Sequence, residues 1–82
     1  MTIKKTQLEA KIKEYNFSNP KTPLTKKNID LAIKINELRE KRKEYAQKQD
    51  VENHQKVSKE LFHIADNNDQ ARFFADMIKN VR

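Results

Sequence analysis

Hydrophobic positions recur at helical spacing along the whole chain. In the first segment Leu8, Ile12 and Tyr15 are separated by four and three residues, which places them on one face of a helix. The same segment carries lysines at positions 4, 5, 11 and 13. No stretch shows the strict alternation that is typical of a half-buried strand. The pattern therefore predicts a basic amphipathic helix over residues 1–15.

Both prolines of the chain, Pro20 and Pro23, lie in the polar stretch that follows. Because the residue before a proline is pushed away from the helical region, this stretch predicts a loop over residues 16–24. Thr25 is a suitable N-cap for a second helix. Residues 25–65 then form a predicted helical hairpin, whose first half carries a heptad seam of Leu31, Ile35, Leu38, Arg42, Tyr45 and Gln49.

Two features of this hairpin have more than one interpretation. Asp50 can cap a separate third helix, but the absence of Gly and Pro after Pro23 also allows one bent helix from Thr25 to Ala65. Arg42 stands where the seam requires an apolar residue. Because a buried lone charge is costly, the seam is interrupted there, or Arg42 extends to the surface, or it pairs with an acidic partner.

The last part of the chain predicts a turn at residues 66–69 and a C-terminal helix over residues 70–81. The apolar side of this helix contains Phe73, Phe74, Met77, Ile78 and Val81. Since Phe73 and Phe74 are adjacent, one of them can point away from the core. The predicted fold class is all-α: a small bundle of three to four helices around a long helical hairpin, in one domain of residues 1–82.

Composition excludes several classes of function. The chain has 82 residues, of which 35% are hydrophobic and 37% charged, and it contains no Gly, Cys or Trp. Without Cys there is no disulfide framework and no thiol nucleophile, and without Gly there is no glycine loop to hold a phosphate. No segment is long and apolar enough to cross a bilayer, and the opening residues lack the apolar core of a signal peptide. We therefore expect the protein to reside in the cytoplasm.

The residues offer little for chemistry. The two histidines, His54 and His63, do not have the spacing of metal ligands on one helix. Ser58 lies four residues after His54, but a catalytic serine also needs an oxyanion hole and a cleft. We expect no enzymatic activity, no metal and no cofactor. The interruption of the seam by Arg42 and the pair of phenylalanines instead favour a surface that binds a partner, formed by Leu38, Arg42, Tyr45, Phe73, Phe74 and Met77.

Charge is unevenly distributed. The chain carries a net charge of +6, and residues 1–48 contain 13 basic and 6 acidic side chains. Such a basic half favours, as an alternative function, a small protein that binds nucleic acid or modulates transcription. The basic first helix could also contact an anionic membrane surface, although its short apolar face is better explained by packing on the rest of the chain. The small apolar fraction leaves room for a homodimer.

The opening MTIKKTQLEA (residues 1–10), the length of 82 residues and the lack of a signal or membrane segment resemble the RIII cytoplasmic antiholins of T-even bacteriophages. The resemblance implies a protein that inhibits lysis without catalysis. Proteins of that kind bind the cytoplasmic N-terminal part of the phage holin and so delay the formation of holes in the inner membrane. The partner implied by the resemblance is thus the holin, and the location is the host cytoplasm or the cytoplasmic face of the inner membrane.

Overall fold

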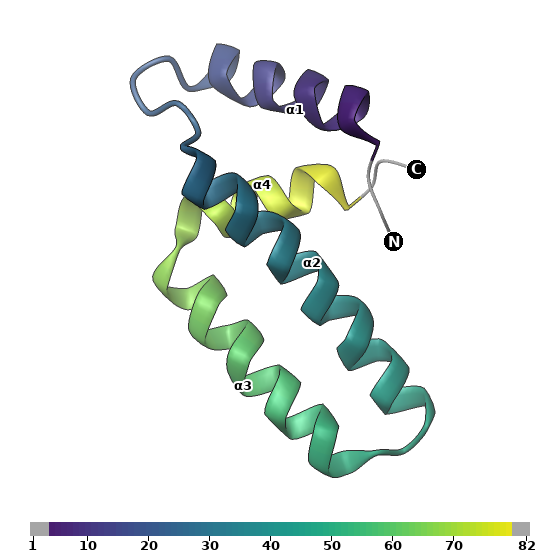
Figure 1. Cartoon of the computed structure of the whole chain (residues 1–82). Helices are drawn as coiled ribbons and strands as arrows, with labels where there is room; N and C mark the ends of the chain where they lie inside the picture. Colours follow the sequence, from purple (N-terminus) through teal and green to yellow (C-terminus); the bar gives the residue numbers. More distant parts are fainter. Residues whose placement is uncertain (1–3, 80–82) are drawn as a thin grey trace.

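The computed structural model describes residues 4–79, and within this range the chain forms four helices and no strand. They are α1 (Lys5–Ser18), α2 (Lys26–Gln47), α3 (Val51–Asn67) and α4 (Asp69–Ile78). The predicted all-α class is confirmed. Figure 1 shows α2 and α3 as an antiparallel hairpin, with α4 turning back across the upper half of α2 and α1 lying at the same end. The molecule is elongated, with extents of 42 × 26 × 15 Å.

Several predicted boundaries are wrong by a few residues. Helix α1 continues to Ser18, so that the connection to α2 begins at Asn19 and not at residue 16. Pro20 restricts only the residue directly before it, and the helix therefore ends one residue ahead of that position. Helix α3 runs two residues beyond the expected end at residue 65, and α4 begins at Asp69 and ends at Ile78. The remainder of the predicted helix over residues 70–81 lies partly outside the described residues.

The turn between α2 and α3 decides between the two interpretations of the hairpin. Two separate helices meet at Asp50, whose carboxylate accepts a hydrogen bond from the backbone N–H of Asn53 at 3.3 Å. Gln49 adopts φ 58°, in the left-handed region that glycine usually occupies at the end of a helix. The N–H of Asp50 then donates to the carbonyl of Tyr45 at 2.9 Å, as in a Schellman motif. In a chain without glycine, Gln49 takes the strained position that ends α2.

The core lies where α2 meets both α3 and α4. Alanines at 32, 71 and 75 are completely buried, which allows α4 to approach α2 closely. Helix α4 is only ten residues long and contributes four buried residues, whereas the fourteen residues of α1 contribute only Tyr15. The buried set is Tyr15, Ala32, Ile35, Leu38, Val57, Leu61, Ala65, Ala71, Phe74, Ala75 and Ile78.

Candidate partner-binding site

Two of the six residues predicted to bind a partner belong to the core. Phe74 is 0% exposed and Leu38 is 2% exposed, so neither forms part of the surface. Phe74 packs edge-to-face against Tyr15, with 6.0 Å between the ring centres. Leu38 occupies a seam position of α2 that faces the neighbouring helices. The prediction of these two as surface residues is wrong, because packing between the helices buries both.

The four remaining predicted residues do not form one surface patch. Arg42 lies on the hairpin, where its guanidinium stacks over the ring of Phe62 from α3 at 5.3 Å from the centroid. Tyr45 and Met77 are partly buried against the core. Phe73 instead lies on α4, next to α1. Arg42 therefore lies between α2 and α3, whereas Phe73 lies between α4 and α1.

The stacking on Phe62 explains how Arg42 fits into the heptad seam. The charge remains at the edge of the hairpin, where water still reaches it, and the aromatic face replaces an acidic partner. The sequence pattern signals this position as an anomaly but does not identify its partner. Phe62 is half-exposed, and the stacking reduces the apolar surface that it presents to water.

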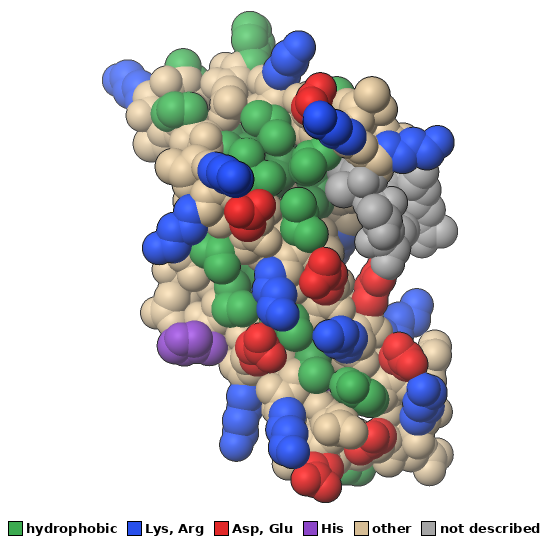
Figure 2. All heavy atoms as spheres, viewed as in Figure 1, with side chains coloured by type: hydrophobic (Ala, Val, Ile, Leu, Met, Phe, Trp, Pro, Cys, Tyr) green, Lys and Arg blue, Asp and Glu red, His purple; other side chains and the backbone are tan. Residues whose placement is uncertain are grey.

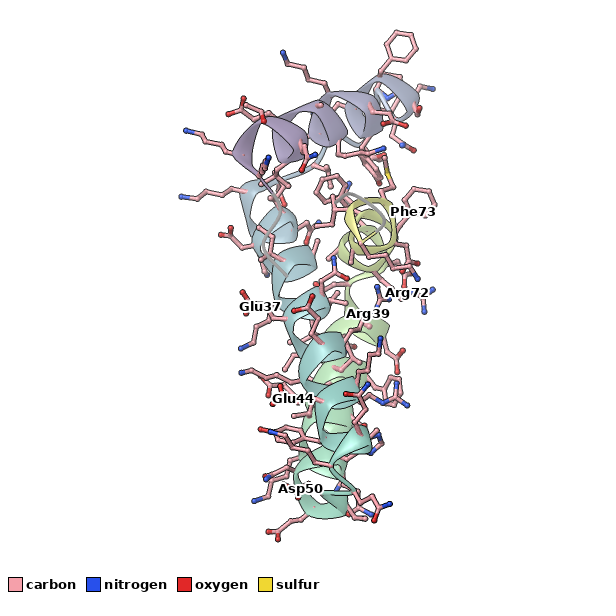
Figure 3. The ribbon with its side chains drawn as sticks, turned by 90° about the vertical axis from the view of Figure 1, so that its right-hand side faces the viewer. Glu37, Arg39, Glu44, Asp50, Arg72 and Phe73 are labelled. Atoms are coloured by element: carbon pink, nitrogen blue, oxygen red, sulfur yellow. The ribbon has the colours of Figure 1, made fainter. Side chains whose placement is uncertain are left out.

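An open groove lies between α1, α4 and the α1–α2 loop. Phe73 stands at its rim, 58% exposed, with the edge of its ring against Tyr15 at a centroid distance of 5.9 Å. Figure 3 shows Phe73 and Arg72 side by side along the same edge of α4. The groove is lined by Tyr15, Asn19, Thr22, Asp69, Gln70, Arg72, Phe73 and Asp76.

Hydrogen bonds from distant parts of the chain fix one wall of this groove. The side-chain amide of Gln70 donates to the carbonyl of Thr22 at 3.0 Å and accepts a hydrogen bond from the amide of Asn28. The first turn of α4 is thus tied both to the loop and to α2. Asn19 closes the end of α1, since its backbone and side-chain N–H groups both donate to the carbonyl of Tyr15. None of these contacts is visible as a pattern in the sequence.

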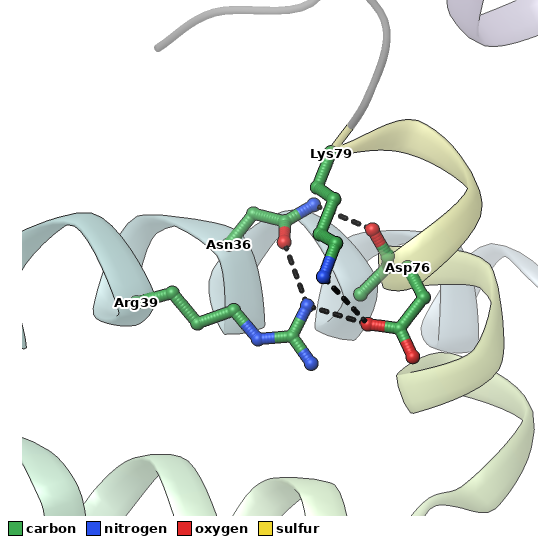
Figure 4. A network of polar contacts seen from close by, with 5 residues as sticks. Asn36, Arg39, Asp76 and Lys79 are labelled. Atoms are coloured by element: carbon green, nitrogen blue, oxygen red, sulfur yellow. Dashed lines mark hydrogen bonds and ion pairs between the residues drawn. The ribbon is translucent and has the colours of Figure 1, made fainter.

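A polar network fixes the position of α4 against α2 (Figure 4). The amide of Asn36 donates to the carbonyl of Ala75 at 3.1 Å, and Arg39 donates to the side-chain oxygen of Asn36 at 3.2 Å. The same guanidinium forms an ion pair with Asp76 at 2.9 Å, and Lys79 approaches that carboxylate at 3.9 Å. Because Asp76 is neutralised from α2, it does not pair with Arg72, which lies one turn away on α4.

Arg72 consequently forms no side-chain hydrogen bond or ion pair with any residue that the structure describes. Its charge stands beside the exposed ring of Phe73, at the rim of the groove. Arginine and large aromatic residues are the side chains most often responsible for affinity in protein interfaces. The combination suits a partner that supplies a carboxylate next to an apolar side chain. Phe73 is among the residues predicted from the sequence to bind a partner, whereas Arg72 is not, because it has no distinguishing pattern around it.

The carboxylates with altered acidity lie at the other end of the molecule, near the hairpin turn. A hydrogen bond from Lys48 lowers the pKa of Glu44, and hydrogen bonds from Asn53 lower the pKa of Asp50. Both effects follow from ordinary ion pairing and helix capping. Among residues 4–79 no group of three or more His, Cys, Asp or Glu residues is arranged to hold a metal ion. None of the helices in this range has the length and apolar character needed to span a membrane.

Comparisons with known proteins give no assignment. No family model, curated protein or solved structure matches the chain. The geometry of the groove and the resemblance in sequence are therefore the basis for a functional proposal.

Proposed function

We propose that this protein is a non-enzymatic regulator of phage-induced host cell lysis. It acts as an antiholin in the host cytoplasm, where it binds the cytoplasmic N-terminal part of the holin. Binding holds the holin in a form that cannot assemble, and the opening of the inner membrane is delayed. The mechanism is stoichiometric and requires no reaction.

The observation that carries the binding role is the exposed ring of Phe73 at the rim of the groove, beside Arg72, which pairs with none of residues 4–79. The resemblance of residues 1–10 and of the chain length to RIII antiholins supplies the identity of the partner. We place the holin segment in the groove between α1 and α4. An apolar side chain of that segment packs against Phe73 and Tyr15, and an acidic side chain pairs with Arg72.

The experiment is a binding titration of the purified chain with the N-terminal cytoplasmic segment of the phage holin in solution, without membranes. We expect a complex that persists at high salt, because its centre is apolar. Phe73→Ala and Arg72→Glu should each weaken the complex by a factor of about ten or more, as is typical of residues at the centre of an interface. Circular dichroism shows whether each variant remains helical.

The matched control is Phe17→Ala, which removes an exposed phenylalanine outside the groove. It should leave the affinity unchanged. Equal affinities of folded Phe73→Ala and wild type would exclude the groove, and the absence of any complex with the holin segment would exclude the antiholin function. Retention of nucleic acid that is lost steeply with added salt would favour the alternative, a nucleic-acid-binding protein.

A further inference from the structure

The connection between α1 and α2 carries an unusual surface. Residues 15–29 contain no Asp or Glu, although acidic residues occur throughout the rest of the chain. Phe17, in the last turn of α1, is 89% exposed and is the most exposed large hydrophobic residue that the structure describes. Exposure of an aromatic side chain to this degree has no role in the core, and Phe17 does not line the groove.

The loop that displays this surface has a fixed shape. The backbone N–H of Leu24 donates to the side chain of Asn16 at 2.8 Å, which closes the loop onto α1. Within the loop the N–H of Thr22 donates to the carbonyl of Asn19 at 3.1 Å. Because these contacts fold the backbone inward, its outer side chains face solvent. The exposed residues of this connection are Phe17, Ser18, Pro20, Lys21, Thr22, Pro23, Thr25, Lys26 and Lys27.

The lysines of this surface differ from those of the hairpin in their ion pairs. Lys21, Lys26 and Lys27 form no ion pair with any described residue, whereas Lys34, Lys48 and Lys56 of the hairpin each pair with a glutamate. Figure 2 shows Lys and Arg side chains projecting at the upper left, around the loop, next to apolar side chains. Positive charge is thus concentrated here, with Glu14 and Asp30 as the nearest acidic residues along the chain.

The shape of this surface distinguishes between anionic partners. A protein segment binds most strongly in a groove, but Phe17 is 89% exposed at the end of α1 and lines no groove among the described residues. Single-stranded nucleic acid binds to a series of aromatic side chains, and this surface has only one. A protruding aromatic ring among lysines instead fits the boundary between anionic headgroups and acyl chains of a bilayer. Helix α1 cannot lie with its apolar face in lipid, because Leu8 and Ile12 pack against the core.

We propose that the α1–α2 connection is a membrane-contact surface that places the protein on anionic lipid bilayers. Lys21, Lys26 and Lys27 bind the headgroup phosphates, and Phe17 inserts its ring below them. None of the four proposed lipid-binding side chains lines the groove at Phe73 and Arg72. The proposal does not depend on the antiholin function, because it concerns lipid alone.

The test is sedimentation of the full chain with vesicles of phosphatidylcholine that contain or lack phosphatidylglycerol. We expect binding only to the vesicles with phosphatidylglycerol, and a decrease as salt is added. Replacement of Lys21, Lys26 and Lys27 by Gln should weaken partitioning by a factor of about 100 at low salt, since each lysine near an anionic surface contributes roughly fivefold. Phe17→Ala should weaken it by a factor of about five, since the ring is only partly inserted.

Two matched controls identify the surface responsible. Replacement of Lys41, Lys43 and Lys59, which are exposed on the hairpin, changes the net charge equally and should reduce partitioning far less. Phe73→Ala should not affect vesicle binding, just as Phe17→Ala should not affect holin binding, so each proposal can fail independently. Equal loss from both lysine triples, or an unaltered Phe17→Ala variant, would overturn the proposed surface. Binding to duplex DNA as tight as that to vesicles would reassign the lysines to nucleic acid.

Discussion

Helix α2 is connected to its neighbours in contrasting ways at its two ends. The turn toward α3 is self-contained: Asp50 donates its N–H to Tyr45, and its carboxylate accepts from Asn53 only three residues later. The loop from α1 is held from outside, by Asn16 of α1 and by Gln70, which lies 48 residues after Thr22 in the sequence. The turn toward α3 is therefore specified by local sequence, whereas the loop from α1 depends on tertiary contacts in addition to the local cap at Thr25.

This difference has consequences for stability and for function. The hairpin end is supported by short-range hydrogen bonds and can form before the rest of the bundle. The loop end depends on the docking of α4, and α1 adds a single buried side chain, Tyr15, to the core. We expect α1 and the loop to open at a lower free energy than the hairpin. Both proposed binding surfaces lie at this less stable end, where adjustment to a partner costs least.

The largest effect is expected from Phe74→Ala, which removes the side chain that joins α1, α2 and α4. Loss of a completely buried phenylalanine should lower the free energy of unfolding by about 3–5 kcal/mol. A domain of this size has a total stability of roughly 5–15 kcal/mol, so the loop end should detach or the whole domain unfold. Urea denaturation followed by circular dichroism measures the change.

The neighbouring residue supplies the control for this prediction. Phe73→Ala removes an identical side chain that is half-exposed, and it should cost about 1 kcal/mol, mainly from the contact with Tyr15. Phe74→Leu is a milder replacement that should keep the domain folded, and its loss of stability should lie between those of Phe73→Ala and Phe74→Ala. Equal losses of stability for Phe73→Ala and Phe74→Ala would contradict the position of Phe74 in the core.

A smaller effect is expected from Gln70→Ala, which breaks the external support of the α1–α2 loop. The side-chain amide of Gln70 forms hydrogen bonds with both Thr22 and Asn28. Loss of these two hydrogen bonds should lower the free energy of unfolding by about 1–2 kcal/mol. Amide hydrogen exchange should accelerate in α1 and the loop while that of α3 remains unchanged. Uniform acceleration along the chain would show that the two ends of α2 are not independent.

The same contrast explains how far the sequence predicts the structure. The start of α2 at Thr25 is confirmed, and of the two interpretations at Asp50 the structure has the separate third helix; each side chain caps its own helix. The predicted end of α1 at residue 15 is wrong. The polar residues Asn16 and Ser18 favour a loop in the sequence, but both belong to α1, and the side chain of Asn16 accepts a hydrogen bond from the N–H of Leu24. Local signals determine the starts of α2 and α3, whereas a contact across the loop accompanies the end of α1.

The candidate site was only partly predictable for a related reason. Phe73 and Phe74 differ by 100° around the helix axis, and which of them faces the core depends on where α1 and α2 lie. Arg42 is recognisable as an anomaly, but Phe62, which stacks on it, lies on a different helix. The charge of the groove residue Arg72 is left available because Asp76 forms its ion pair with Arg39 of α2. The surface thus arises from long-range pairing that no spacing reveals.

The hairpin end offers a stabilising substitution. Gln49 has φ 58°, a conformation that costs a residue with a side chain more than it costs glycine. Gln49→Gly should raise the free energy of unfolding by about 0.5–1 kcal/mol, after allowance for the greater freedom of glycine in the unfolded chain. The control is Gln47→Gly, within the last turn of α2, which should lower it by about the same amount. Thermal denaturation of both variants measures the two changes, and a loss of stability in Gln49→Gly would contradict the left-handed conformation.

The smallest effect is a pH dependence of the hairpin turn. Hydrogen bonds from Asn53 lower the pKa of Asp50 in the folded protein, so its contribution is complete above the unfolded pKa of about 4 and disappears as the pH falls through the lower folded value. Asp50→Asn can cap the helix without titrating. As the pH falls from 6 to 3, the urea midpoint of the wild type should therefore decrease more than that of Asp50→Asn. The other carboxylates are common to both proteins, so their effects cancel in this comparison. A constant difference across that range would mean that the Asp50 cap does not hold the turn, and that α2 and α3 are joined by their packed seam alone.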